Sequence, residues 1–230
     1  MQTSAWQVLE PSLPLLAADY GGGRARMVAL GLEGGGLVVW SPGVPERQGN
    51  ALEDLRNFGE PRFLLAPNHF HNLGIPHWTR SFPSARVVAS ERARTRLSKK
   101  LPGIVIDGLE GLSRALPPGT RLLCPPNAKQ GETWLAVERD TLRALVVCDA
   151  IVNMQHVSIP FKILGFRARL MLNPFFKRFF MGDRAAHRAW MLAELGAHPP
   201  NLLIPAHGEM LQGARVADDL RRVVETLPAR

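Results

Sequence analysis

Three strand-like segments of the sequence end in residues that can bind a metal ion. His69 and His71 lie in PNHFHNLG, Asp149 lies in VVCDA, and His207 lies in IPAHGE. Alternate residues of an extended segment point the same way, so both histidines of the first segment can reach one ion. A carboxylate without a partner after a buried strand would be costly. We therefore predict His69, His71, Asp149 and His207 as metal ligands, with Asp149 and His71 as catalytic residues.

Each of these residues also has an ordinary structural interpretation. A single histidine after a strand is commonly a hydrogen-bonded structural residue, and Asp149 could cap a helix or bind a loop amide. The case for a site depends on all three segments having the same form, an apolar run followed by a ligand type.

The elements that must position these residues follow from the hydrophobic pattern. Strands are predicted at 61–67, 85–90, 120–126, 133–140, 142–150 and 201–207. Two more are predicted within residues 24–42, where they form a hairpin around the glycine-rich turn of residues 31–36. Helices are predicted at 50–59, 74–83, 91–101 and 213–227. This alternation predicts a layered α/β fold in one domain, residues 1–230.

Composition narrows the class of protein. The 230 residues carry a net charge of +8 and only two cysteines, Cys124 and Cys148, each in an apolar run. We expect buried thiols without a disulfide in a reducing cytoplasm, and no secretory signal, because Glu10 interrupts the first apolar stretch. Arginines scattered along the chain account for the positive charge, and no nucleic-acid partner is expected.

The order of the ligand-bearing segments resembles the metallo-β-lactamase superfamily. Its members carry H-x-H-x-D-H after one strand, an aspartate after another and a late histidine before glycine. The segment PNHFHNL is similar to a degenerate form of the first motif, found in a divergent and little-characterised branch. The resemblance implies a four-layer αββα sandwich and metal-dependent hydrolysis.

Several positions depart from the family pattern. If Gly74 is aligned with the family glycine, the ligand positions of the first motif become Pro67, His69, His71 and Asn72. The family's middle histidine is also missing, and its place falls on Asn127, Lys129 or Glu132, of which Glu132 could bind a metal.

Because the sequence offers fewer metal ligands than the family pattern, two functions are open. The first is a mononuclear hydrolase of a small ester, thioester or lactone, with one divalent ion, zinc before iron or manganese. The second is a catalytically inactive member without metal that binds or docks a partner.

A basic, aromatic segment interrupts the α/β pattern. We predict a helical insertion over 159–197, in which His187 faces solvent, as His198 does after it. Residues 161–184 mix phenylalanines with lysines and arginines, a composition that fits a membrane-surface contact, a dimer contact or a lid. The alternative is a helix that packs its phenylalanines on the core.

Overall fold

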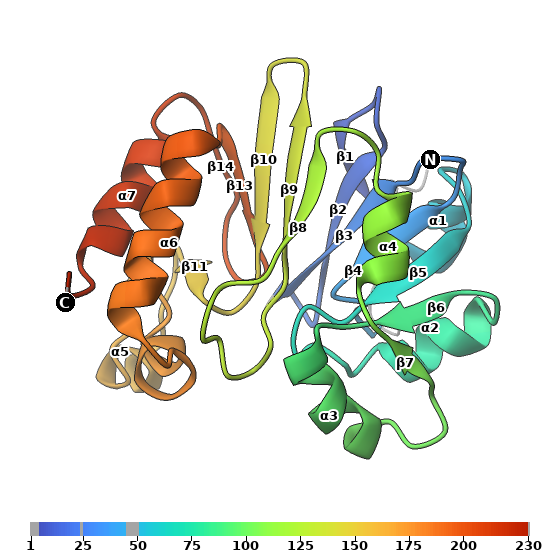
Figure 1. Ribbon diagram of the computed structural model, residues 1–230, viewed down its shortest axis with the longest axis horizontal. Helices are drawn as coiled ribbons and strands as arrows, with labels where there is room; N and C mark the ends of the chain where they lie inside the picture. The colour runs from blue at the N-terminus through green and yellow to red at the C-terminus, as the bar shows by residue number, and fades with distance from the viewer. Residues whose placement is uncertain (1–4, 24, 45–50, 230) are drawn as a thin grey trace. The chain divides into compact units, whose positions relative to one another are not determined.

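The computed structural model describes residues 5–23, 25–44 and 51–229. The chain divides into two compact units, Met1–Pro118 and Gly119–Arg230. Both units combine a sheet with helices, which confirms the predicted α/β class (Figure 1).

The first unit is built on a sheet in which seven described strands follow their sequence order. Strands β1 (Gln7–Glu10), β2 (Leu15–Tyr20), β3 (Ala25–Gly31) and β4 (Leu37–Trp40) are antiparallel neighbours. Strands β5 (Pro61–Leu65), β6 (Arg86–Val88) and β7 (Ile106–Asp107) continue the sheet in parallel with β4. The carboxyl ends of β4 and β5 therefore lie at the same edge.

In the described part of this unit, helices α1 (Ala51–Arg56), α2 (Ile75–Ser81) and α3 (Glu91–Lys100) connect the parallel strands β4 to β7, and α4 (Glu110–Ala115) follows β7. The first three insert apolar side chains such as Leu55, Trp78 and Leu97 into one core with alternate residues of the strands. The strand residues between them, among them Val28 and Val38, are also buried. Burial on both faces explains why these strands are continuous apolar runs in the sequence.

The second unit holds a five-stranded sheet in the order β14-β13-β10-β9-β8 among its described residues. Strands β8 (Thr120–Leu123), β9 (Trp134–Arg139) and β10 (Leu142–Val147) form an antiparallel meander. Strand β13 (Leu202–Pro205) is parallel to β10, and the short β14 (Leu211–Gln212) closes the edge. Helices α6 (Arg184–Ala197) and α7 (Val216–Glu225) lie side by side in this unit (Figure 1).

The predicted helical insertion over 159–197 is only partly helical. It contains α5 (Ile159–Ile163), the π-helical turn η2 (Phe176–Phe180) and α6, but Leu170–Leu172 form a strand, β12. This strand pairs with β11 (Ile151–Asn153), and the hydrophobic pattern of the segment gives no sign of that pairing. His187 is fully buried, so the prediction that it faces solvent was wrong. Its ring packs between Phe176 and Trp190, at centroid distances of 5.5 and 6.0 Å.

The strands and helices predicted elsewhere in the sequence lie close to their predicted positions, whereas no prediction was made for α4, β7, β11 and β14. The two cysteines differ from each other, because Cys148 is buried whereas Cys124 is exposed after the edge strand β8. The prediction that both thiols are buried was therefore wrong for Cys124. None of the helices in the described part of the chain has the length and apolar character needed to cross a bilayer.

Candidate functional site

His71 is held in the first unit by two hydroxyl groups. Its Nδ1 lies 2.8 Å from the Ser41 hydroxyl, which lies 3.0 Å from the Tyr20 hydroxyl. Ser41 follows β4 and His71 lies in the loop after β5, so the parallel pairing of these strands brings them together. Histidines that bind metals commonly use one ring nitrogen for the ion and the other for a hydrogen bond that orients the ring. The position of His71 has this form.

The loop that carries His71 is fixed by its own side chains. The buried Asn68 carboxamide accepts hydrogen bonds from the N–H groups of Phe70 and His71, at 2.7 and 3.2 Å. The loop ends at Gly74, where a Cβ atom would lie 2.3 Å from the carbonyl oxygens of Pro42 and Gly43. A glycine is required here because the two backbone segments approach too closely for any side chain.

His69 is buried beside two cations. Its Nε2 lies 3.2 Å from an Arg96 guanidinium nitrogen, and its carbonyl accepts a hydrogen bond from Lys100 Nζ at 3.0 Å. A guanidinium can only donate, so Nε2 is the acceptor of this hydrogen bond. The lone pair that would bind a metal through Nε2 is therefore directed at Arg96. The His69 carbonyl also accepts a hydrogen bond from Asn72 Nδ2 at 2.6 Å. Asn72, another position of the aligned motif, is therefore a structural residue.

In the second unit, Asp149 and His207 form a close pair. The Asp149 Oδ1 and His207 Nε2 atoms are 3.1 Å apart, and both side chains are partly buried. Asp149 follows β10 and His207 follows β13, and these strands are parallel. Their carboxyl ends meet at one edge of the sheet, so the two side chains converge. A carboxylate and an imidazole this close offer the donor types that zinc binds in proteins.

The loop of His207 is clamped onto β11 by Asn153. The Asn153 N–H donates to the His207 carbonyl at 3.2 Å, and the Asn153 carbonyl accepts from the Glu209 N–H at 2.8 Å. Its carboxamide adds a hydrogen bond to the Glu209 carbonyl at 2.9 Å. Gly208 has φ +94°, and a Cβ atom there would lie 1.9 Å from the Asn153 carbonyl oxygen. The clamp therefore requires a glycine directly after His207.

Glu132, the position considered for the missing middle histidine, is a buried support of the Asp149 loop. Its carboxyl oxygens accept hydrogen bonds from Gln130 Nε2 at 2.7 Å, Trp134 Nε1 at 2.6 Å and the Ala150 N–H at 3.0 Å. Burial, reinforced by the negative charge of Asp149, raises the pKa of Glu132 to about 8, while these hydrogen bonds act in the opposite direction. Glu132 thus fixes the backbone next to Asp149.

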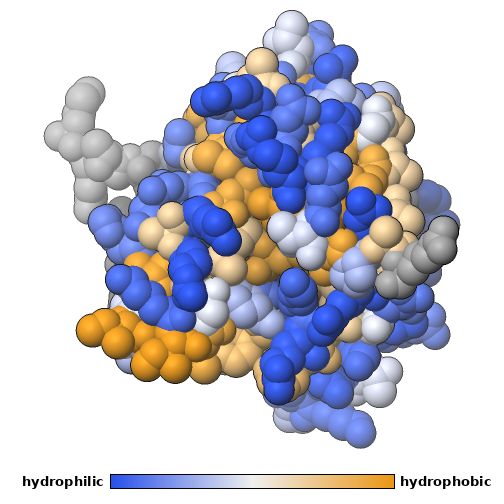
Figure 2. Space-filling model, turned by 90° about the vertical axis from the view of Figure 1, so that its left-hand side faces the viewer, coloured by the Kyte–Doolittle hydropathy of each residue, from blue (hydrophilic) through white to orange (hydrophobic). Residues whose placement is uncertain are grey.

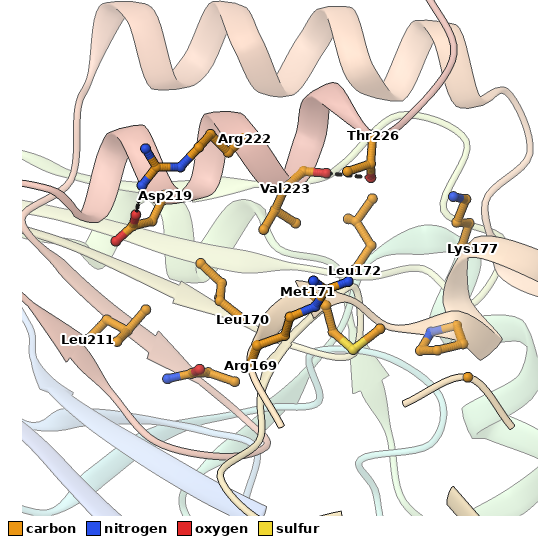
Figure 3. A pocket seen from close by; sticks show the side chains of 13 residues that line it. Arg169, Leu170, Met171, Leu172, Lys177, Leu211, Asp219, Arg222, Val223 and Thr226 are labelled. Carbon is orange, nitrogen blue, oxygen red and sulfur yellow. Dashed lines mark hydrogen bonds and ion pairs between the residues drawn. The ribbon is translucent and has the colours of Figure 1, made fainter. Parts of the chain in front are cut away.

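A cavity of about 700 Å³ lies in the second unit between β12, β14 and α7 (Figure 3). Its apolar wall contains Leu170, Leu211 and Val223, whose side chains point into the same space. Asn153 lines the cavity as well, so the residue that clamps the His207 loop also faces this space. The volume falls within the range of roughly 300 to 1,000 Å³ typical of small-molecule sites.

The structure thus brings two of the four predicted ligands together within one unit, Asp149 and His207. In the first unit, His71 contacts hydroxyls and His69 contacts Arg96. Sequence reasoning missed Ser41 and Asn153. Ser41 could have been considered because it directly follows a predicted strand, whereas no local pattern distinguishes Asn153.

No protein-family model matches the sequence, and no curated protein matches it. Solved structures of low sequence identity share its fold. A metallo-β-lactamase from Pontibacter korlensis superposes with a TM-score of 0.62 at 12% identity, over 96% of this chain and 99% of that chain. The metallo-β-lactamase FIM-1 from Pseudomonas aeruginosa, in its mono-zinc form, gives 0.62 at 11% identity, over 96% and 94%. A fragment of the putative diflavin flavoprotein A 5 from Nostoc sp. gives 0.62 at 14% identity, over 98% of both chains.

Proposed function

Because this chain has the metallo-β-lactamase fold, and because its second unit pairs a carboxylate with a histidine, we propose that it is a metal-dependent hydrolase. The proposed substrate is a small ester, thioester or lactone. The observation that carries the proposal is the 3.1 Å approach of Asp149 and His207 on the ends of two parallel strands. Rigid strand ends are where α/β proteins concentrate functional side chains.

The donor set of this pair fits a borderline divalent ion, zinc before iron or manganese. We propose a single ion, with Asp149 and His207 as ligands. The prediction that His69 and His71 supply further ligands stays a prediction, and the Ser41 contact of His71 supports it for that residue. A bound ion would polarise a substrate carbonyl and lower the pKa of a water molecule to about 7.

The remaining steps fall to the protein's own groups. Asp149 and His71 are the proposed catalytic residues, because a carboxylate and a neutral imidazole can each accept a proton from a water nucleophile. The Ser41 and Tyr20 hydroxyls orient the His71 ring, and the Asn153 clamp orients the loop of His207. These contacts hold the reacting groups in place before a substrate binds, which lowers the entropic cost of the reaction.

The alternative function is a catalytically inactive protein of this fold that binds or docks a partner. Two observations favour it: Arg96 occupies Nε2 of His69, and Glu132 uses both carboxyl oxygens for internal hydrogen bonds. We also propose a cytoplasmic location, supported by the lack of a disulfide between Cys124 and Cys148.

Metal analysis of protein purified without chelator tests the proposal. We expect close to one equivalent of zinc, iron or manganese, which is lost in the His207→Ala and Asp149→Ala variants. The matched control is His198→Ala, because His198 is partly exposed and pairs with Glu138 in the same unit. Hydrolysis of p-nitrophenyl acetate and of a small thioester should fall with the metal content.

Two results separate the functions. Metal-bound protein whose esterase activity disappears in the His207→Ala variant but persists in His198→Ala supports the hydrolase. Metal-free protein whose thermal stability does not change on adding zinc contradicts it and supports the inactive alternative.

A further inference from the structure

The cavity between β12 and α7 combines an apolar wall with a basic rim. Leu170, Leu172, Leu211 and Val223 supply aliphatic surface. The charged residues of the lining are Arg169, Lys177, Arg222 and Asp219, and the last two form an ion pair with each other (Figure 3).

Two of these cations have no acidic partner in the described part of the chain. Neither Arg169 nor Lys177 forms an ion pair with a described carboxylate, and Asp219, the acidic residue of the lining, forms its ion pair with Arg222. An aliphatic wall gains free energy by covering an apolar chain, and unneutralised cations attract an anionic group. The cavity therefore has complementary surfaces for both parts of an amphiphilic anion.

We propose that this cavity binds the chain of a free, medium-length aliphatic carboxylate, with its carboxylate at Arg169 and Lys177. Asn153 connects the cavity to the second unit's carboxylate–histidine pair, because it lines the cavity and hydrogen-bonds the His207 carbonyl. An occupant in contact with Asn153 therefore lies next to the loop that carries His207. This binding does not depend on the proposed hydrolysis.

Isothermal titration calorimetry on the full chain, treated with EDTA, tests the site without metal. Sodium decanoate should bind with one-to-one stoichiometry and at least tenfold more tightly than 1-decanol or acetate. Val223→Glu, which places a negative charge on the wall, and Arg169→Gln should each weaken decanoate binding about tenfold. The control Arg139→Gln changes an exposed arginine at the end of β9, outside the cavity, and should leave the affinity unchanged.

Decanoate that binds no more tightly than decanol would overturn the role of the cations. Unchanged affinity in a folded Val223→Glu variant would show that decanoate binds elsewhere. If Val223→Glu does not fold, Arg169→Gln decides, because Arg169 is exposed and its replacement leaves the core intact.

The segment 159–179 carries many exposed apolar side chains. Six of the ten large hydrophobic side chains that are exposed in the described residues come from these positions. Figure 2 shows a contiguous apolar area at the lower edge of the face that it presents. The six are Ile159, Phe161, Ile163, Leu164, Phe175 and Phe179.

The phenylalanines of this segment are linked by ring contacts, and the sequence around them is basic. Phe161, Phe166, Phe175 and Phe179 form a series of ring contacts with centroid distances of 5.4, 5.8 and 6.2 Å. From residue 150 to residue 182 the sequence has five lysines and arginines and no aspartate or glutamate. Exposed aromatic and aliphatic groups among cations match the boundary of an anionic bilayer, where apolar groups enter and cations meet lipid phosphates.

We infer that the segment 159–179 docks on the surface of anionic lipid bilayers. Co-sedimentation of the full chain with vesicles tests this. Vesicles with 30% phosphatidylglycerol should bind the protein, pure phosphatidylcholine vesicles should bind it at least tenfold more weakly, and salt should reduce the binding. Phe161→Ser should weaken the partition about tenfold and Lys162→Gln about fivefold. The matched controls Val105→Ser and Lys99→Gln change exposed residues of the first unit and should have no effect.

Equal binding to neutral and anionic vesicles, or no binding to either, would overturn the inference. A dimer in sedimentation velocity that Phe161→Ser dissociates would do the same, since it would assign this surface to contacts between copies of the chain.

Discussion

Replacing Gly208 by alanine tests whether the Asn153 clamp holds the loop of His207. An alanine Cβ atom would lie 1.9 Å from the Asn153 carbonyl oxygen, so one of the two backbone segments must move by more than 1 Å. That movement breaks or weakens the three hydrogen bonds of the clamp, each worth about 0.5 to 1.5 kcal/mol. The φ of +94° adds a cost of about 1 kcal/mol for any side chain. We expect Gly208→Ala to lower the free energy of unfolding by about 3 kcal/mol.

Urea unfolding followed by circular dichroism and tryptophan fluorescence measures this loss. The matched control is Gly196→Ala near the end of α6, where a Cβ atom would meet nothing within 4 Å. Alanine is favoured over glycine in a helix, so this variant should be as stable as the wild type or slightly more so. A loss below 1 kcal/mol in Gly208→Ala would refute the close approach of Gly208 and Asn153.

Three further outcomes are expected. In metal-free protein, the free energy of unfolding should fall as pH rises from about 4.5 to about 8, because Glu132 keeps its proton over this range in the folded protein but loses it in the unfolded chain. Urea titrations at several pH values should show a smaller fall in the Glu132→Gln variant. Burial lowers the pKa of His187 from 6.5, so stability should be lost as pH falls below 6.5, and His187→Phe should reduce this loss; an equal pH dependence in both proteins would contradict the burial of a neutral ring. Ellman's reagent should titrate the exposed Cys124 in the native protein and Cys148 only in denaturant; rapid reaction of both thiols would count against the buried position of Cys148, where burial also raises the pKa of the thiol.

Local sequence patterns predicted most of the elements and the strand ends that carry Asp149 and His207. The apolar runs before these residues are long enough for strands, and the polar residue at the end of each run marks where the strand leaves the core. The same reasoning was wrong where a pairing partner decided the structure. Strand β12 forms because Leu172 pairs with Ile151 of β11, and the composition of the segment around it resembles that of a helix.

The chemistry of the candidate site depends on contacts between residues far apart in the chain. His207 meets Asp149 across 58 positions, His71 meets Ser41 across 30, and His69 meets Arg96 across 27. His69 and His71 are equivalent in the sequence, two histidines of one short motif. The tertiary structure separates them, because Arg96 on α3 is directed at one ring and the Ser41 hydroxyl after β4 at the other.

The sequence by itself determined the α/β class, the approximate position of most strands and helices, and the three segments that offer metal-binding side chains. These properties follow from hydrophobic periodicity and residue type, which neighbouring positions encode. Only the tertiary structure decided that Asp149 meets His207, that Glu132 supports the Asp149 loop, and that the segment 159–179 exposes aromatic side chains. The order and direction of strands determine these contacts, and the pairing of β10 with β13 is a choice that no short stretch of sequence contains.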